Sequence, residues 1–562
     1  MALLQIQNLS FSYSQEQNKA IDGLSLAVEP GEFVCFCGES GCGKTTLFQL
    51  IKREIAPYGK LEGEIFLEGK PLRDYPDRGC AARLGFVGQN PETQIVTDKV
   101  WHELAFGLES LGWESGRIRR RVAEIAGFFG IEEWFHKKTA ELSGGQKQLL
   151  NLASVMAMEP NILLLDEPTA QLNPVSASAF LQTLEKLNRE LGLTILIAEH
   201  RLDEVFPLSD RVVLMEQGRI LCTGSPAEVG KQLSSFSDHP MFDSLPSSMR
   251  IFYQLGEEGD APLTVREGSL FLSGTYGNRF DTVPREAAPF DGEPVLEARD
   301  LWFRFEKESP DVLRGLSLSV HRGEHLCILG GNGSGKTTLL RLLSGLIRPY
   351  RGSVSVLGRK LQSFSGNSLY RHTLARLPQD ISSVFLEQTV ELELESMCRM
   401  MEISGDSARE SIREVADLLG LNRLLDRHPY DLSGGEQQKT ALAKLILQSP
   451  RILLLDEPTK GIDAHGKRIL ANLFYEWKKT GVTLVTVTHD VEFAASVADR
   501  CGILFDGEIL SSAPAAEFFA GNTFYTTAAN RISRNHFRNA VSCEEVVSLC
   551  RRNGKREGER RE

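Results

Sequence analysis

The chain has 562 residues, of which 41% are hydrophobic and 25% charged, and a formal net charge of −12 at pH 7. This length exceeds what a single hydrophobic core usually serves, so we expect at least two domains. The acidic balance argues against a general nucleic-acid binder, and we expect no nucleic-acid partner. No run approaches the roughly 18 apolar residues of a membrane span, and the N-terminus alternates like a strand instead of a signal peptide, which favours a cytosolic protein. The 10 cysteines show no paired spacing, so we expect small buried side chains in a reducing compartment.

The first elements in the chain predict a strand, a loop and a helix. Residues 3–9, continuing to Tyr13, and the runs 24–28 and 33–37 are expected to be strands. The last strand leads into GESGCGKTT, whose glycines let backbone N–H groups converge on phosphate oxygens. Lys44 would reach the β- and γ-phosphates and the Thr45 hydroxyl would ligate Mg²⁺, at the positive end of a helix that begins near Thr45. The candidate nucleotide ligands are Gly38, Glu39, Ser40, Gly41, Cys42, Gly43, Lys44, Thr45 and Thr46.

The next part of the chain predicts short strands and then helices. Strands are expected at 63–69 and 84–90, the second ending at Gln89, followed by a mainly helical stretch from 97 to 138. In LSGGQKQ at 142–148, free N–H groups at a helix start and the Ser143 hydroxyl suit a phosphate. The following helix keeps its apolar residues on one face.

Two carboxylates mark the end of the next strand. ILLLDEP at 162–168 has the unbroken apolar run of a buried parallel strand. Asp166 is placed to hold Mg²⁺ through water, and Glu167 to orient and deprotonate an attacking water. Another apolar strand, 193–198, ends at Glu199 and His200. Because α/β sheets bind ligands at such strand ends, these residues predict one hydrolytic site.

The whole pattern then recurs. Residues 226–294 are rich in Ser, Pro, Gly and acidic residues and predict a linker with one helix near 247–255. A second phosphate loop, GGNGSGKTT, occupies 330–338, and Ser433 stands 23 residues before Asp456 as Ser143 stands 23 before Asp166. Tyr13 and Phe305 each stand 25 residues before the first glycine of a loop, so both are candidates to stack on a purine base, with simple packing as the alternative. The charged end, 548–562, is expected to be disordered, and contact with lipid headgroups is an alternative.

Each half resembles the nucleotide-binding domain of ATP-binding-cassette proteins, over residues 1–230 and 294–525, which leaves a linker at 231–293 and a tail at 526–562. The resemblance implies an α/β fold of two P-loop NTPase domains, each with a mainly parallel core sheet, an antiparallel β subdomain and a helical signature subdomain. It implies an ATPase that uses ATP and Mg²⁺, with two domains packed head to tail so that Lys44 faces Ser433 and Lys336 faces Ser143. The implied catalytic residues are Glu167, Glu457, His200, His489, Gln89 and Gln379, and the implied Mg²⁺ residues are Thr45, Gln89, Asp166, Thr337, Gln379 and Asp456. The further nucleotide-binding residues are Ser143, Gly145, Ser433 and Gly435 in the signatures, and Gly330, Gly331, Asn332, Gly333, Ser334, Gly335, Lys336, Thr337 and Thr338 in the second loop.

A narrower resemblance concerns the segment QNPETQIVTDKVWHELAFGLESLG, which is similar to the segment after the Q-loop in energy-coupling-factor ATPases. Those ATPases drive vitamin and trace-metal importers, and the fragments APLTVREG and GNTFYTTAANRI look like the same group. The resemblance implies a transmembrane coupling subunit, a small substrate-binding membrane subunit, and a peripheral location at the cytoplasmic face of the cell membrane. We expect 89–111 to form part of a groove for a membrane helix, using Ile95, Val96, Val100, Leu104 and Phe106, with Glu103 and Glu109 exposed.

Several alternatives stay open. Residues 89–111 could instead form a simple core helix. The chain could be a soluble tandem cassette protein that acts on ribosomes or DNA, although its linker is acidic and lacks clustered cysteines, or a tandem sugar-importer ATPase, although both catalytic glutamates are present. One departure from the family pattern predicts asymmetry, because PTAQLN ends in Asn173 where PTKGID ends in Asp463. We expect the site containing Glu457 to hydrolyse ATP more slowly, with a harmless exchange as the alternative.

Overall fold

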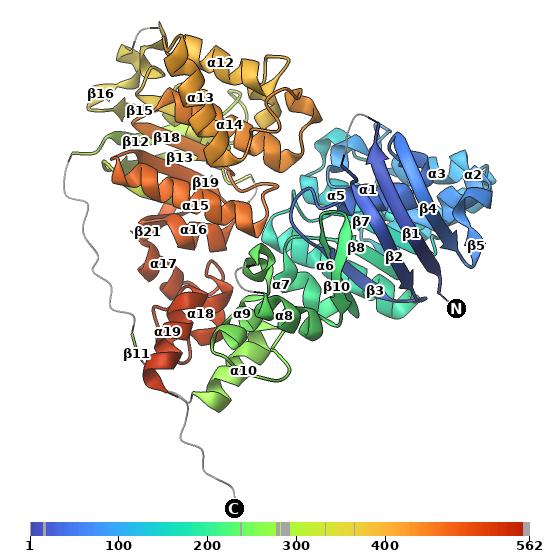
Figure 1. The fold of residues 1–562 in the computed structure, drawn as a ribbon. Coiled ribbons are helices and arrows are strands. Elements are labelled where there is room, and N and C mark those ends of the chain that lie inside the picture. Colours follow the sequence, from blue (N-terminus) through green and yellow to red (C-terminus); the bar gives the residue numbers. More distant parts are fainter. Residues whose placement is uncertain are drawn as a thin grey trace, which may run out of the picture. The chain divides into compact units, whose positions relative to one another are not determined.

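A computed structural model describes residues 2–14, 18–236, 239–276, 281–282, 293–331, 333–364 and 366–554. Its contacts divide the chain into two units, Met1–Thr264 and Val265–Glu562 (Figure 1). The predicted ligand Asn332 lies outside the described residues. The two predicted domains therefore correspond to two compact units, and the division falls inside the predicted linker.

The core of the first unit is a six-stranded sheet in the order β10-β9-β3-β8-β7-β6. All neighbouring strands are parallel except β10, which pairs antiparallel with β9. Every residue of β3, β7 and β8 is buried, as their unbroken apolar sequences predict. The strands are β3 Phe33–Cys37, β6 Leu84–Val87, β7 Ile162–Asp166, β8 Thr194–Ala198, β9 Arg211–Glu216 and β10 Arg219–Gly224.

An antiparallel sheet packs over one face of this core, with helix α1 (Lys44–Ile51) in the same hydrophobic cluster. Its order is β2-β1-β4-β5 (Figure 1). Phe11 from this sheet, Phe48 from α1 and Leu164 from β7 share one hydrophobic core. The packing fixes α1 directly behind the phosphate loop. The strands are β1 Leu4–Tyr13, β2 Ile21–Val28, β4 Gly59–Leu67 and β5 Lys70–Pro71, so β2 and β4 begin earlier than the sequence pattern predicts.

Helices complete the first unit. The signature helix α5 (Gly144–Ala157) packs against α3 (Val100–Ser110), α4 (Ser115–Phe128) and strand β6. These helices form the subdomain that the resemblance implies. The remaining helices are α2 Asp77–Arg83, α6 Pro174–Leu191, α7 Leu202–Val205, α8 Pro226–Ser235 and α9 Ser247–Gln254.

The second unit repeats this topology. Its core sheet has the order β17-β18-β19-β14-β20-β21, and its antiparallel sheet the order β13-β12-β15-β16. The strands are β12 Leu296–Phe303, β13 Leu313–Val320, β14 His325–Leu329, β15 Arg351–Val356, β16 Arg359–Lys360, β17 Leu374–Leu377, β18 Ile452–Asp456, β19 Thr483–Thr488, β20 Arg500–Phe505 and β21 Glu508–Pro514. The helices are α11 Lys336–Leu343, α12 Val390–Met400, α13 Asp406–Leu419, α14 Gly434–Gln448, α15 Ala464–Lys479, α16 Val491–Val497 and α17 Ala515–Gly521.

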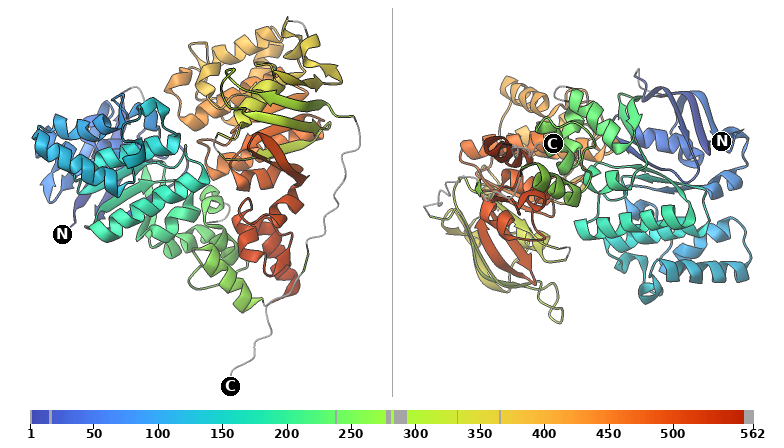
Figure 2. Two further views of the ribbon diagram at one scale, coloured as in Figure 1. Left: turned by 180° about the vertical axis from the view of Figure 1, so that it is seen from behind. Right: turned by 90° about the horizontal axis from the view of Figure 1, so that it is seen from below.

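The predicted linker and tail contain more structure than expected. The helix near 247–255 is present as α9, but α8 and α10 (Val265–Thr275) also fall within 226–294. Helix α10 packs against α18 (Ala528–Ser533), and β11 (Asp281–Thr282) pairs in parallel with β22 (Phe537–Arg538) (Figure 1; Figure 2). The expectation of a disordered end at 548–562 is wrong for 548–553, which belong to α19 (Cys543–Asn553), because a capping box starts this helix and its apolar face is buried. The rest of that prediction, 555–562, lies outside the described residues. The buried residues are Cys543, Val546, Val547, Leu549 and Cys550.

All ten cysteines are buried and none forms a disulfide, which confirms the prediction that they are small buried side chains. Within the described ranges, we find no helix that combines the length and the apolar character needed to cross a bilayer.

Candidate nucleotide sites

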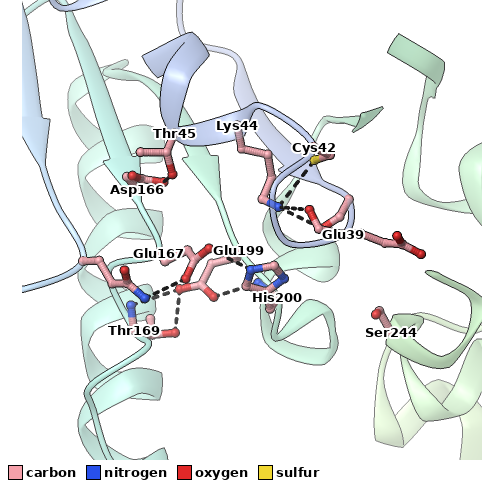
Figure 3. Close-up of polar contacts among 12 residues, drawn as sticks. Glu39, Cys42, Lys44, Thr45, Asp166, Glu167, Thr169, Glu199, His200 and Ser244 are labelled. Atoms are coloured by element: carbon pink, nitrogen blue, oxygen red, sulfur yellow. Dashed lines mark hydrogen bonds and ion pairs between the residues drawn. The ribbon is translucent and has the colours of Figure 1, made fainter. Parts of the chain in front are cut away.

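The first phosphate loop joins β3 to α1 and requires glycine. Gly43 has φ 106°, and a Cβ atom there would lie 2.5 Å from the Ala20 carbonyl oxygen. Lys44 is only 4% exposed, and its Nζ donates to the carbonyl oxygens of Gly38 at 2.8 Å and Glu39 at 3.1 Å (Figure 3). A buried ammonium group that curls over its own loop is placed to meet phosphate oxygens in the same cradle.

The second loop is built in the same way. Gly335 has φ 101°, and Lys336 Nζ donates to the carbonyl oxygens of Gly330 at 2.8 Å and Gly331 at 2.9 Å. Burial lowers the pKa of Lys336, although the charges of Glu457 and Asp456 oppose this shift. Both loops therefore present a lysine and a turn of backbone N–H groups in equivalent positions.

A hydroxyl and a carboxylate meet beside each loop. Thr45 Oγ1 donates to Asp166 Oδ1 at 3.1 Å (Figure 3), and Thr337 Oγ1 donates to Asp456 Oδ1 at 3.3 Å. Burial, followed by the charge of Glu167, raises the pKa of Asp166 to about 6, and burial also raises the pKa of Asp456. Asp456 Oδ2 is buried without a hydrogen-bond partner among the described residues. Oxygen ligands of this kind suit Mg²⁺, so the residues present fit such an ion at both sites.

The glutamate after each of these aspartates has an unusual backbone conformation. Glu167 has φ 46° and Glu457 has φ 51°, in the left-handed region that side-chain-bearing residues seldom adopt. Each conformation is fixed by the neighbouring strand, because the Glu167 N–H donates to the Ala198 carbonyl oxygen and the Glu457 N–H to that of Val487, both at 2.9 Å. Strain of this kind persists where the surroundings enforce it and is concentrated at functional sites.

The two glutamates differ in their side-chain contacts. Glu167 Oε1 lies 2.7 Å from His200 Nε2 (Figure 3). Glu167 Oε2 accepts a hydrogen bond from Gln89 Nε2 at 2.9 Å. The structure thus brings three predicted catalytic residues of the first unit together. We predicted this group from two strand ends and the Q-loop, and its geometry suits a base that is held from both sides.

In the second unit the glutamate is held differently. Glu457 Oε2 accepts hydrogen bonds from Thr488 Oγ1 at 3.0 Å and the His489 N–H at 3.2 Å, and lies 2.9 Å from His489 Nδ1. Burial raises the pKa of Glu457, but the hydrogen bonds and charges of His489, together with Lys336 and Thr488, outweigh it, so this pKa lies below its usual value. Among the described residues, Gln379 forms no hydrogen bond with Glu457, whereas Gln89 donates one to Glu167 in the first unit.

The signature serines begin their helices at the surface. Ser143 and Ser433 are exposed N-caps, and each forms a capping box, with Gln146 and Glu436 respectively. Gly145 and Gly435 follow in the first helical turn. Their contact with the phosphate loop of the opposite unit stays a prediction.

The two predicted aromatic residues lie in different environments. The Tyr13 hydroxyl lies 2.9 Å from Thr46 Oγ1, which ties the end of β1 to the phosphate-loop helix. Phe305 is 61% exposed and packs edge-on against Phe303. Stacking of either ring on a base stays a prediction.

Two charged residues near these sites have contacts that the sequence did not predict: Glu199 was placed at a strand end without a role of its own, and Arg376 was missed. Glu199 is 2% exposed and accepts hydrogen bonds from Thr169 Oγ1 at 2.6 Å and the His200 N–H at 3.1 Å (Figure 3). Arg376 lies in β17 and reaches Asp456, with Nη2 3.6 Å from Oδ2. A charge at the end or middle of an otherwise apolar strand was the available signal in both cases.

Comparison with known proteins now identifies the family. A family model described as ABC transporter matches residues 21–170 and 313–460, one match in each unit. The chain belongs to the ABC transporter family. Similar curated proteins include an ABC transporter ATP-binding protein of Bacillus cereus, 41% identical over 98% of both chains. Another, from Methanosarcina mazei, is 31% identical and covers 92% of this chain and 90% of its own.

Among solved structures, cbiO1 from Clostridium perfringens is 34% identical and is described as part of the ABC transporter complex cbiONQ. The match covers 41% of this chain and 92% of that chain, with a TM-score of 0.38. As a member of the ABC transporter family with two such domains, the chain is an ATPase that binds ATP. ATP-binding subunits of this family generally pair with membrane subunits.

Proposed function

We propose that this ABC transporter ATPase energises an importer of the energy-coupling-factor type, for a vitamin, a vitamin precursor or a trace metal ion. It would act at the cytoplasmic face of the cell membrane, with a transmembrane coupling subunit and a small substrate-binding membrane subunit. The observation that carries the proposal is a groove of about 410 Å³ in the first unit, between α2, α3 and the segment after Gln89. We call this groove the α2–α3 groove.

Hydrogen bonds connect the lining of the α2–α3 groove to the candidate hydrolytic site. Gln94 lines the groove, its Oε1 accepts from the Gly88 N–H at 2.8 Å, and its Nε2 donates to the Phe86 carbonyl oxygen at 3.3 Å. Gln89, next to Gly88, donates to Glu167. A partner helix seated in the groove would therefore touch a short, hydrogen-bonded segment whose other end holds the glutamate, and this supports coupling of docking to hydrolysis.

Some of the residues that we expected to line the groove do so, and others do not. Val96 and Phe106 line it and are 64% and 40% exposed, which leaves apolar area for a partner. Val100 and Leu104 are fully buried and belong to the core, so their predicted role in docking is wrong. Helix α3 is amphipathic, and these two residues lie on its inner face.

A buried carboxylate is one of the charged side chains of the groove, which is also lined by Glu54, Asp77 and Arg78. Glu103 also lines the groove and is 4% exposed, which corrects the expectation that it is exposed. Its Oε2 accepts from the N–H groups of Val96 at 3.1 Å and Thr97 at 2.7 Å, but no lysine or arginine of the described residues pairs with it. In the second unit the equivalent Glu393 pairs with Lys444 Nζ at 2.6 Å. A partner helix with a basic side chain would supply the missing charge in the first unit.

We propose the following roles for the two nucleotide sites. Lys44 and Lys336 bind the β- and γ-phosphates, and Glu167 and Glu457 orient the attacking water and accept its proton. Mg²⁺, when bound, neutralises phosphate charge, and the residues that would hold it are Thr45, Gln89 and Asp166 in one site and Thr337, Gln379 and Asp456 in the other. Head-to-tail pairing of the two units would add Ser433 to the first site and Ser143 to the second.

Purification of the tagged full chain from detergent-solubilised membranes tests the proposal. We expect two membrane proteins to co-purify, and Phe106→Asp to release them while ATP binding is retained. Phe128→Asp is the matched control, because Phe128 is similarly exposed, at 38%, on α4 outside the groove. Co-purification of ribosomes or DNA instead would favour a soluble tandem cassette protein, and a sugar-importer membrane pair would favour that alternative.

A further inference from the structure

The aspartates next to the two phosphate loops have different neighbours. In the second unit Arg376 Nη2 lies 3.6 Å from Asp456 Oδ2, and the Arg376 side chain is 12% exposed and that of Asp456 1%. In the first unit no cationic side chain of the described residues forms an ion pair with Asp166, and Phe86 takes the place of the arginine. One site therefore contains an internal counter-charge that the other lacks.

The strand register shows that these positions are equivalent. Arg376 in β17 is paired with Leu454 in β18, and Phe86 in β6 is paired with Leu164 in β7. Asp456 and Asp166 follow two residues after these leucines, so they project from the same face of the sheet. The difference is thus a substitution at one position of the repeated fold, and a long side chain there reaches along the sheet to the carboxylate.

The arginine neutralises the carboxylate without binding both of its oxygens. Asp456 Oδ1 accepts from Thr337, whereas Asp456 Oδ2 and Arg376 Nε have no hydrogen-bond partner among the described residues. At 3.6 Å the guanidinium is close enough for a strong electrostatic interaction in these buried surroundings. Asp456 Oδ2 thus keeps no hydrogen bond from the described residues, but its negative potential is reduced.

We propose that Arg376 is a positioning residue of the second nucleotide site, which acts through Asp456 to weaken the binding of the divalent cation that accompanies ATP. This inference rests on the proposed role of Asp456 and Asp166 toward Mg²⁺. The cation that enters the second site meets a carboxylate already paired with a fixed positive charge. In the first site the apolar Phe86 leaves the full charge of Asp166 for the cation.

The test is the affinity for Mn²⁺, measured by electron paramagnetic resonance in the presence of a non-hydrolysable ATP analogue. The full chain with Lys44→Ala reports on the second site alone, and the full chain with Lys336→Ala reports on the first. We expect Arg376→Met, which keeps an unbranched side chain and removes the guanidinium and its charge, to tighten Mn²⁺ binding at the second site roughly tenfold, or about 1.4 kcal/mol. Phe86→Arg is expected to weaken it at the first site by a similar factor.

Two controls separate this inference from the assumptions beneath it. Arg371→Met removes an exposed arginine that pairs with Glu402 instead, and it is expected to leave Mn²⁺ affinity unchanged. Asp456→Asn is expected to weaken Mn²⁺ binding at the second site, and an unchanged affinity there would refute the proposed role of Asp456 itself. If Asp456→Asn behaves as expected but Arg376→Met leaves Mn²⁺ affinity unchanged or lowers it, the proposal for Arg376 is overturned. The affinity of Arg376→Met for the ATP analogue is also measured without metal. If it changes by the same factor as the Mn²⁺ affinity, the proposal for Arg376 is overturned as well.

Discussion

The substitution Ser154→Lys would give the first unit the ion pair that the second unit already contains. Ser154 lines the α2–α3 groove and occupies the position in α5 that Lys444 occupies in α14. Lys444 Nζ lies 2.6 Å from Glu393 Oε2 and donates to the Val384 carbonyl oxygen at 2.7 Å. Glu103 accepts hydrogen bonds from the N–H groups of Val96 and Thr97, and Glu393 accepts them from the equivalent N–H groups of Leu386 and Glu387. We therefore expect the new lysine to reach Glu103 in the same way.

The magnitude follows from the burial of the pair. In the second unit the side chain of Lys444 is 12% exposed and that of Glu393 1%, so a partner removed from this pair leaves a buried charge, at a cost of about 3 kcal/mol or more. Introducing the ion pair into the first unit stabilises it by less than this cost, because the new lysine must also be desolvated. We expect Ser154→Lys to raise the free energy of unfolding of the first unit by about 1 kcal/mol. This corresponds to a rise in Tm of roughly 2–4 °C for a domain of this size.

The assay compares the thermal unfolding and membrane-partner retention of the full chain. We expect Ser154→Lys to retain ATP binding, to raise Tm and to lose its membrane partners, because the carboxylate in the groove is already neutralised. Ser154→Met is the matched control, since it fills the groove to a similar extent without a charge and is expected to retain more of the partners. Equal partner loss in the two variants would show that bulk alone blocks the groove, and a lower Tm for Ser154→Lys would refute the ion-pair reasoning.

Three further predictions concern the nucleotide sites. The double substitution of Lys44 and Lys336 by Ala removes both phosphate contacts and is expected to abolish ATPase activity, so a wild-type rate would contradict the site assignment. The pKa of Asp166 is raised from 3.8 to about 6, so its favourable effect on folding is complete below pH 3.8 and is lost as the pH rises through 6. Asp166→Asn is therefore expected to raise the free energy of unfolding of the ATP-free chain by about 3 kcal/mol at pH 8, and a gain that does not grow between pH 5 and pH 8 would refute this. In the assembled transporter, Glu167→Gln is expected to lower the ATPase rate more than Glu457→Gln, and equal losses would exclude the asymmetry.

The sequence predicted the repeated fold because its strongest signals are local. Buried parallel strands such as β7 are continuous apolar runs, and the glycine at position 43 is required by a left-handed turn. Segments that depend on distant partners were predicted poorly. Helix α10 is stabilised by α18, more than 250 residues away, and nothing in the composition of either segment indicates this contact.

The sequence predicted most residues of the candidate site, but it did not predict their hydrogen bonds and ion pairs. Each functional residue follows a strand or begins a helix, so its place was evident from the sequence. The environment of Glu103 was not, because a charged residue on an amphipathic helix usually faces solvent, and only the folded loop turns two N–H groups toward it. Arg376 was missed for a related reason, since its role depends on the register of two strands separated by 74 residues or more.

Three differences between the two nucleotide sites all predict slower ATP hydrolysis at the second site. Although Glu457 is buried, the hydrogen bonds and charge of His489, with Lys336 and Thr488, hold its pKa below the usual value, and a lower pKa makes a carboxylate a weaker base. Another difference is that the first unit has Asn173 where the second unit has Asp463. Both side chains cap the following helix in the same way, since Asn173 accepts a hydrogen bond from the Ser176 N–H at 2.8 Å and Asp463 accepts one from the Gly466 N–H at 2.7 Å. The exchange removes a negative charge, which in the proposed head-to-tail pair would face the site of Glu457. The surroundings of Glu457, the arginine beside Asp456 and the missing carboxylate at 173 all favour slower turnover at the second site, so we expect the first site to hydrolyse ATP faster.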